Sequence, residues 1–243
     1  MKLVSHTRGD GPRTAALVHG ASESSAAWQD FADILVEKYD LKLIIVDQRG
    51  HGASPRADSY RIDDFVGDLV ETLPTGVDFL FGQSLGGRTA VLAAPKLQAK
   101  HYIGVDPAFS LPWYFGPTMS VVAAFQSALP KRVQRAQAVR RTGEESADRQ
   151  LANWAAWDRR MIPSLVRTAN RPAFVPQPPA VPSTLVLAEH SIVVPPPVAR
   201  EFAARGWDVR VLPGAPHDMH IQVPAALADL LDDVLAVPAR KTL

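Results

Sequence analysis

The residue best suited to do chemistry is Ser84, in the segment Gly82-Gln83-Ser84-Leu85-Gly86-Gly87. A run of β-forming residues, 77–81, precedes this segment, and an alanine-rich stretch with helical spacing, 85–96, follows it. In a Gly-x-Ser-x-Gly turn between a strand and a helix, the serine takes a strained backbone conformation, and the glycines remove the Cβ atoms that would clash. The hydroxyl then projects at a helix N-terminus, which favours a developing oxyanion. Ser84 is therefore predicted to be a nucleophile.

The elements that position this serine alternate along the chain. Short apolar runs predict buried strands at 14–18, 43–47, 77–81, 102–106, 184–188 and 208–212. Helical spacing of apolar residues predicts helices at 26–38, 60–73, 85–96, 196–205 and 223–235. This alternation predicts an α/β fold with a mainly parallel sheet and helices on both faces. In such sheets ligands bind beyond the carboxyl ends of the strands.

One segment, 111–181, interrupts the alternation because it has helical stretches but no convincing strand. We expect it to form a helical cap on a single-domain core made of residues 1–110 and 182–243. Aromatic residues in such an insertion could cover a site at the strand ends and favour a partly apolar substrate. The residues expected to bind substrate are Trp113, Tyr114, Trp154 and Trp157, with Phe115 beside them. The alternative is that the tryptophans only pack the insertion against the core.

Composition excludes several classes of function. Lys and Arg number 26 against 25 Asp and Glu, so the net charge of +1 provides no field for nucleic acid. The absence of cysteine excludes disulfides, thiolate metal sites and a cysteine nucleophile. No His/Asp/Glu spacing suggests a metal site, and no Gly-x-Gly-x-x-Gly or Walker pattern is present, so we expect no cofactor. No run approaches the roughly 20 apolar residues of a membrane span, and we expect a cytoplasmic protein acting on a small molecule.

Four segments in serial order resemble the motifs of the α/β-hydrolase superfamily. They are His19-Gly20 after a strand, the stretch 47–54 (Asp-Gln-Arg-Gly-His-Gly-Ala-Ser), the Ser84 turn, and the stretch 214–220 (Gly-Ala-Pro-His-Asp-Met-His). The resemblance spans nearly the whole chain and implies that fold, although the fold alone does not select one reaction. It also implies an oxyanion hole formed by the backbone N–H groups of Ala21 and Leu85. For His19 and the stretch 47–54, including His51, a structural role is the simpler interpretation.

A serine hydroxyl needs a neighbouring base at neutral pH, and the resemblance places that base at His217, in the loop after the last predicted strand. His220 is the competing candidate, but it matches a variable position of the family.

The triad acid departs from the commonest pattern of the family. Most relatives carry an Asp after the next-to-last strand, where this chain has Ser191, which cannot hold an imidazolium by charge. Asp106 ends the predicted strand 102–106, the next strand after the nucleophile helix, and its surroundings resemble those of certain lipases that place their acid there. We expect Asp106 to orient His217, with Glu189 as the second choice.

The resulting prediction is a serine hydrolase that cleaves an ester, thioester or lactone through an acyl-enzyme on Ser84. Two alternatives remain at this point. A cofactor-independent dioxygenase or lyase on the same fold would use the pair of His217 and Asp106 for proton abstraction, and a non-catalytic member would only bind a ligand. The sequence does not indicate the substrate or the oligomeric state.

Overall fold

The computed structural model describes residues 1–109, 128–164 and 178–236. A central sheet has the strand order β1-β3-β2-β4-β5-β6-β7, and all neighbouring strands are parallel except β1, which is antiparallel to β3. The strands are β1 (Ser5–Arg8), β2 (Arg13–Val18), β3 (Leu41–Val46), β4 (Phe79–Gln83), β5 (His101–Val105), β6 (Ser183–Ala188) and β7 (Asp208–Leu212). This confirms the predicted α/β fold.

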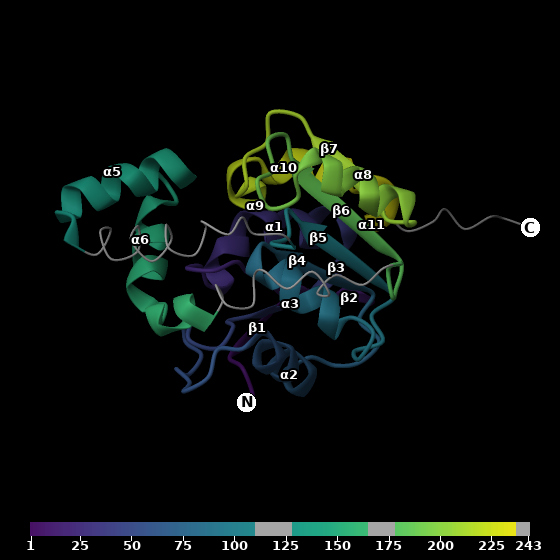
Figure 1. The fold of residues 1–243 in the computed structure, drawn as a ribbon, viewed down its shortest axis with the longest axis horizontal. Helices are drawn as coiled ribbons and strands as arrows, with labels where there is room; N and C mark the ends of the chain where they lie inside the picture. The colour runs from purple at the N-terminus through teal and green to yellow at the C-terminus, as the bar shows by residue number, and fades with distance from the viewer. Residues whose placement is uncertain (110–127, 165–177, 237–243) are drawn as a thin grey trace, which may run out of the picture.

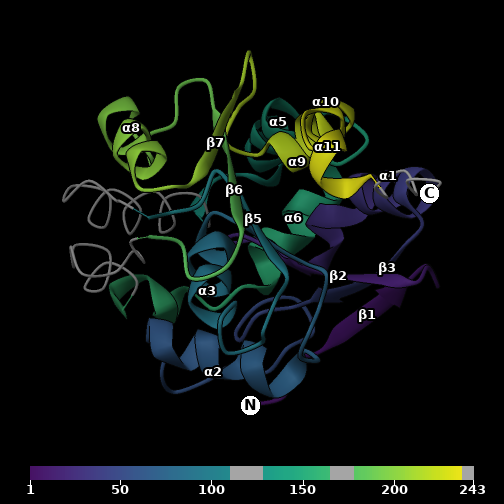
Figure 2. The same ribbon diagram turned by 90° about the vertical axis from the view of Figure 1, so that its right-hand side faces the viewer.

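Helices cover both faces of the sheet (Figures 1 and 2). One face is packed by α2 (Ile62–Thr72), α3 (Leu85–Ala93) and α8 (Pro196–Ala204). The other face is packed by α1 (Gln29–Tyr39), α9 (Met219–Gln222), α10 (Pro224–Leu230) and α11 (Asp232–Leu235). A 3₁₀ turn, η1 (Ser25–Trp28), leads into α1.

The core follows from the two-residue period of the strands. In β2, Ala16 and Val18 pack on the α3 face, while Ala15 and Leu17 pack on the α1 face. Both faces are apolar because both are covered, which explains why the strands appear as continuous hydrophobic runs in the sequence.

The structure differs from the predicted elements at both ends of the chain. The strand β1 was not predicted, because its residues (Ser-His-Thr-Arg) are polar and exposed and carry no apolar signal. It provides one antiparallel strand at the edge of the sheet. The predicted helix 223–235 is two helices, α10 and α11, separated at Leu231.

Between β5 and β6 the chain forms α5 (Lys131–Thr142), α6 (Ala147–Ala156) and the 3₁₀ turn η2 (Arg159–Met161). In Figure 1 the two helices lie beside the sheet rather than over either of its helical layers. Hydrogen bonds tie them to core loops: the Ser24 hydroxyl donates to Asn153 (2.6 Å), and the Tyr60 hydroxyl donates to Asp158 (2.6 Å).

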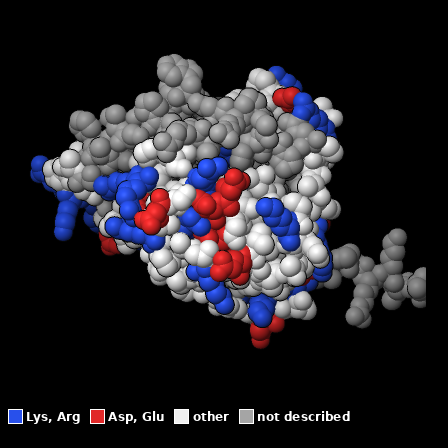
Figure 3. Space-filling view, turned by 60° about the horizontal axis from the view of Figure 1, so that its bottom comes forward, with Lys and Arg blue, Asp and Glu red and all other residues white. Residues whose placement is uncertain are grey.

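Basic and acidic side chains lie next to one another on the face of the molecule in Figure 3. This mixture agrees with the small net charge of +1. In the described part of the chain, no helix is long and apolar enough to cross a bilayer.

Candidate active site

Ser84 lies in a strained turn between β4 and α3. Its backbone has φ 50° and ψ −114°, an unusual conformation for a residue with a side chain. The turn is held from both sides, because the Ser84 N–H donates to the carbonyl of Val105 (3.2 Å) and its carbonyl accepts from the N–H of Ala108 (2.9 Å). These bonds to the end of β5 and the residues after it hold the turn in its strained conformation. A turn of this kind projects the serine hydroxyl from the sheet edge.

The glycines around Ser84 permit this turn by close backbone contact. A Cβ on Gly82 would lie 2.4 Å from the carbonyl oxygen of Gly86, and a Cβ on Gly86 would lie 2.2 Å from the carbonyl oxygen of Val18. Neither position can carry a side chain without movement of backbone. The start of α3 is thus pressed against the end of β2, next to the predicted oxyanion turn.

Asp106 and His217 form a short hydrogen bond, with 2.6 Å between Oδ2 of Asp106 and Nδ1 of His217. Asp106 directly follows β5, is only 1% exposed, and its other carboxylate oxygen accepts from the N–H of Ala188 (3.3 Å). Burial acts to lower the pKa of His217, but the hydrogen bond and charge of Asp106 outweigh burial and raise that pKa above its ordinary value. Because Nδ1 faces the carboxylate, Nε2 is the nitrogen left to accept a proton.

The loop of His217 is attached to the serine turn. The side-chain amide of Gln83, the residue before Ser84, donates to the His217 carbonyl (3.2 Å). Ser84, Asp106 and His217 follow β4, β5 and β7, so the structure brings all three to the carboxyl edge of the sheet. The Ser84 hydroxyl makes no hydrogen bond to His217, although both residues lie in the described part; such contacts are often long in an enzyme without substrate.

Ala21 lies in a turn that faces Ser84. A Cβ on the preceding Gly20 would lie 3.2 Å from the Ser84 Cβ. The N–H groups of Gly20 and Ser22 are occupied, by Glu23 (3.1 Å) and His51 (3.3 Å) respectively. Among the described residues, the N–H of Ala21 has no hydrogen-bond acceptor.

Leu85 is the first residue of α3, where a backbone N–H lacks an intrahelical acceptor. Ala21 and Leu85 thus both lie close to Ser84 in the fold, and their role as oxyanion donors stays a prediction.

His19 and His51 are fully buried and support the loops around the site. Burial lowers the pKa of His19, and burial together with His19 lowers the pKa of His51 to about 3, so both rings are neutral. His19 accepts from the N–H of Gln48 (3.0 Å), and His51 accepts from the N–H of Ser22. Each ring joins the Gly20 turn to the loop after β3.

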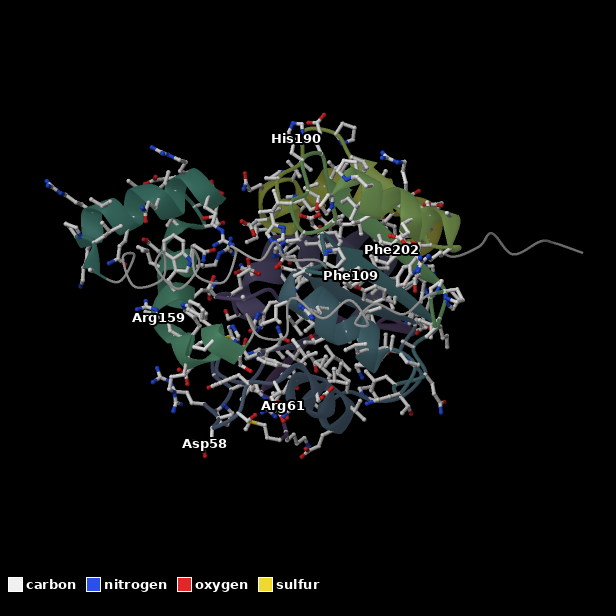
Figure 4. All side chains as sticks on the ribbon, viewed as in Figure 1. Asp58, Arg61, Phe109, Arg159, His190 and Phe202 are labelled. Carbon is white, nitrogen blue, oxygen red and sulfur yellow. The ribbon has the colours of Figure 1, made fainter. Side chains whose placement is uncertain are left out.

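The two competing candidates lie elsewhere. Glu189, the second choice of acid, is exposed and accepts from the N–H of Gly214 (3.0 Å). His190, next to it, lies at the outer tip of its loop (Figure 4). His220 is fully buried against Trp28, with 4.5 Å between ring centroids, and its pairing is with Glu23 at 3.5 Å.

The loop that carries Asp106 is anchored by aromatic packing. Phe109, three residues further on, lies beside Phe202 of α8 (Figure 4), and their ring centroids are 5.5 Å apart. The centroid of the Trp207 ring lies 6.1 Å from that of Phe109. This packing fixes the exit of β5 against the helical layer, and with it the position of the carboxylate.

The aromatic residues expected to bind substrate divide into two groups. Trp113 and Tyr114, with Phe115, lie outside the described residues. Trp154 and Trp157 are 6% and 7% exposed. Trp154 packs against Ala138 and Ala147 within the insertion, and Trp157 stacks on His51. Packing accounts for both tryptophans, and their contact with substrate stays a prediction.

The charged residues around His217 were not predicted from the sequence. Arg141 of α5 binds Asp218 (2.6 and 2.9 Å) and Glu23 (3.4 Å), although these three residues are far apart in the sequence. No signal singled out Arg141, because α5 is rich in basic residues throughout. No group of three metal-ligating side chains occurs among residues 1–109, 128–164 and 178–236.

Comparison with known proteins identifies the family. The family model described as "Alpha/beta hydrolase family" matches residues 16–230. The chain belongs to the alpha/beta hydrolase family. Members of this family are enzymes, and they share the mainly parallel sheet with helices on both faces that this chain forms.

Two curated relatives match parts of this hydrolase-family chain. The 2-(acetamidomethylene)succinate hydrolase of Mesorhizobium japonicum is 37% identical over 93 residues, which are 37% of this chain and 32% of the relative. The sn-1-specific diacylglycerol lipase ABHD11 of Xenopus tropicalis is 33% identical over 138 residues, 53% of this chain and 42% of the relative. The matches thus span less than half of either relative.

A solved structure is similar over a much larger part of the hydrolase-family chain. The enol-lactonase from Burkholderia xenovorans has a TM-score of 0.73 and 21% identity, and the match covers 96% of each chain. At this level of identity the similarity concerns the fold alone.

Proposed function

We propose that this protein is a serine hydrolase that cleaves an ester-type bond, namely an ester, thioester or lactone, of a small substrate. The observation that carries the proposal is the 2.6 Å hydrogen bond of Asp106 to His217 at the sheet edge where Ser84 occupies its strained turn. The names of the two curated relatives, a 2-(acetamidomethylene)succinate hydrolase and a diacylglycerol lipase, agree with hydrolysis but do not indicate this chain's substrate.

In the proposed mechanism Ser84 attacks the substrate carbonyl while Nε2 of His217 accepts the hydroxyl proton. Asp106 holds the imidazole through Nδ1 and stabilises its protonated form. The N–H groups of Ala21 and Leu85 bind the oxyanion, and each such donor contributes about 3 kcal/mol of transition-state stabilisation. His217 then donates its proton to the leaving group. In the second half of the reaction His217 accepts a proton from a water that attacks the acyl carbonyl, and it returns this proton to Ser84 Oγ as the acyl–serine bond breaks and the acid is released.

Residues 111–181 are proposed to be the cap over this site. Their described helices α5 and α6 are bound to the loops that follow β2 and β7 through the pairs Ser24–Asn153 and Asp218–Arg141. A partly apolar substrate is proposed because of the aromatic residues in this segment. We propose no metal or organic cofactor for the reaction.

Acid–base chemistry without an acyl-enzyme is the second candidate, and the position of the acid favours it. Asp106 follows β5 rather than β6, an arrangement that cofactor-independent dioxygenases of this fold share. His217 would then abstract a proton from the substrate, and Ser84 would only orient it. This candidate predicts proton transfer without hydrolysis of simple esters.

Hydrolysis of a series of p-nitrophenyl acyl esters tests the proposal. The wild type should hydrolyse them, and Ser84→Ala should reduce kcat by about 10,000-fold or more, because loss of the nucleophile removes the covalent path. Ser5→Ala, at an exposed position of β1, is the matched control and should keep wild-type activity. Absence of hydrolysis by the folded wild type across the series would favour the second candidate.

A further inference from the structure

A group of ionisable residues lies next to His217 and joins three segments of the chain; its acidic members are buried and Arg141 is partly exposed. We name it the Arg141 cluster: Arg141 on α5, Glu23 after β2, Asp218 after β7, and His220 at the start of α9. The guanidinium binds Asp218 through Nε–Oδ2 (2.6 Å) and Nη2–Oδ1 (2.9 Å), and Nη2 lies 3.4 Å from Oε1 of Glu23. Glu23 and Asp218 are 1% and 7% exposed, and His220 is fully buried.

Each carboxylate bound by Arg141 is attached to a different part of the proposed machinery. Asp218 directly follows His217 in the chain. Glu23 accepts the N–H of Gly20 (3.1 Å), the residue before the oxyanion donor Ala21. The Arg141 guanidinium therefore contacts both the loop that carries His217 and the Gly20–Glu23 turn that carries Ala21. A bidentate arginine–carboxylate pair gives such a link a defined geometry.

The cluster also balances charge beside the base. Burial acts to raise the pKa of Asp218, but Arg141 lowers it to about 2. Burial acts to lower the pKa of Arg141, but Asp218 and Glu23 raise it. Both members of the pair are therefore charged at neutral pH. The carboxylates that act on His217 are Asp106, Asp218 and Glu23, and Arg141 faces the last two.

We propose that Arg141 is a positioning residue through which the inserted helix α5 fixes the His217 loop and the Gly20–Glu23 turn and neutralises the two carboxylates beside the base. This inference rests on the proposed function. It assigns the insertion a part in the reaction that does not depend on contact with substrate.

The test is the pH profile of kcat/KM for Arg141→Met with the best p-nitrophenyl ester. Loss of the link should lower kcat by about 10- to 100-fold, because small displacements of catalytic groups have effects of this size. KM should change less. The uncompensated carboxylates should favour the imidazolium and move the acid limb of the profile to higher pH.

Arg135→Met is the matched control on the same helix, where Arg135 pairs with Glu144 and Asp148 within the insertion. It removes an arginine and its ion pairs but should leave both kcat and the acid limb near the wild-type values. Arg141→Lys keeps the charge but loses the bidentate geometry, so the acid limb should stay in place while kcat is intermediate.

Asp218→Asn provides an independent test if Arg141→Met does not fold. Removal of a carboxylate beside His217 should move the acid limb to lower pH. Adding this change to Arg141→Met should return the limb toward wild type without restoring kcat. The inference is overturned if Arg141→Met equals Arg135→Met in kcat and acid limb, or if Asp218→Asn leaves the limb in place.

If the proposed serine mechanism is wrong, the experiments give a result that differs from those that overturn the role of Arg141. Ser84→Ala with undiminished ester hydrolysis would reject the serine mechanism. NMR titration of the His217 imidazole in Arg141→Met needs no turnover and would still test the cluster: a raised pKa supports it, and an unchanged pKa overturns it.

Discussion

At the scale of single residues, three side chains of ordinary reactivity depend on one another. In the proposed mechanism the Ser84 hydroxyl needs a base, and Asp106, 2.6 Å from Nδ1 of His217, keeps that base in the required tautomer. The carboxylate is almost fully buried, and its second oxygen accepts from the N–H of Ala188, so its position does not depend on mobile solvent.

The Asp106→Asn substitution should reduce kcat by roughly 10²- to 10⁴-fold with the fold intact, because an amide can hold the ring in the wrong tautomer and carries no charge. Glu189→Gln is the comparison and should retain wild-type turnover, since Glu189 contacts the backbone of Gly214 instead. Steady-state kinetics of both variants measures the difference. If the two results were reversed, Glu189 would be the acid.

The pH dependence follows from the raised pKa of His217. A base must be unprotonated, so kcat/KM of the wild type should fall as the pH drops through that pKa, with an acid limb above the ordinary value of about 6.5. In Asp106→Asn the partial burial of the ring remains and the carboxylate that raises its pKa is lost, so the limb should move to lower pH. A limb that stays in place would show that Asp106 does not act on His217.

At the scale of secondary-structure elements, the site depends on the contact between the start of α3 and the end of β2. This contact places the serine turn next to the Gly20 turn, and it requires Gly86 because the backbone of Val18 and His19 occupies the space of a side chain.

Gly86→Ala should therefore separate the two turns and reduce kcat by about 100-fold, the size expected for a displacement near 1 Å. Gly67→Ala is the matched helical control, since a Cβ at this exposed position of α2 meets no atom within 4 Å. The control should keep its activity and gain about 0.5–1 kcal/mol in the free energy of unfolding, because alanine favours helix. Kinetics and urea unfolding of both variants check this, and an active Gly86→Ala would contradict the role of the contact.

The sequence predicted the parts of the site that are local and missed those that are distant. The Ser84 turn is encoded by adjacent residues, and Asp106 and His217 each follow a strand whose apolar pattern is visible. Parallel strands end at one edge, so their meeting follows from the topology. The pairing of Arg141 with Asp218 could not be predicted, because 77 positions separate them and the charges of α5 look alike in the sequence.

At the scale of the whole molecule, the first and last helices are packed on the same face of the sheet. The Tyr39 hydroxyl at the end of α1 donates to the carbonyl of Ala228 (2.9 Å) and lies 3.0 Å from Asp232. This bond links the end of α1 to α10, whose residues Leu227 and Ala228 belong to the core on the same face.

Tyr39→Phe should lower the free energy of unfolding by about 1 kcal/mol, the usual net value of a buried hydrogen bond. The melting temperature should fall by roughly 2–4 °C for a domain of this size. Activity of the folded enzyme should be unchanged, because Tyr39 is remote from the sheet edge that carries Ser84. An unchanged unfolding curve would show that the bond contributes nothing.

Covalent labelling of Ser84 tests the central claim most directly. The wild type, treated with a fluorophosphonate and digested, should carry one phosphonyl group on the peptide that contains Ser84, because His217 and Asp106 activate that hydroxyl. The His217→Ala variant should label far more slowly. A folded wild type that remains unlabelled at Ser84 under conditions that label a known serine esterase would contradict the nucleophilic role and leave proton abstraction by His217 as the chemistry of this site.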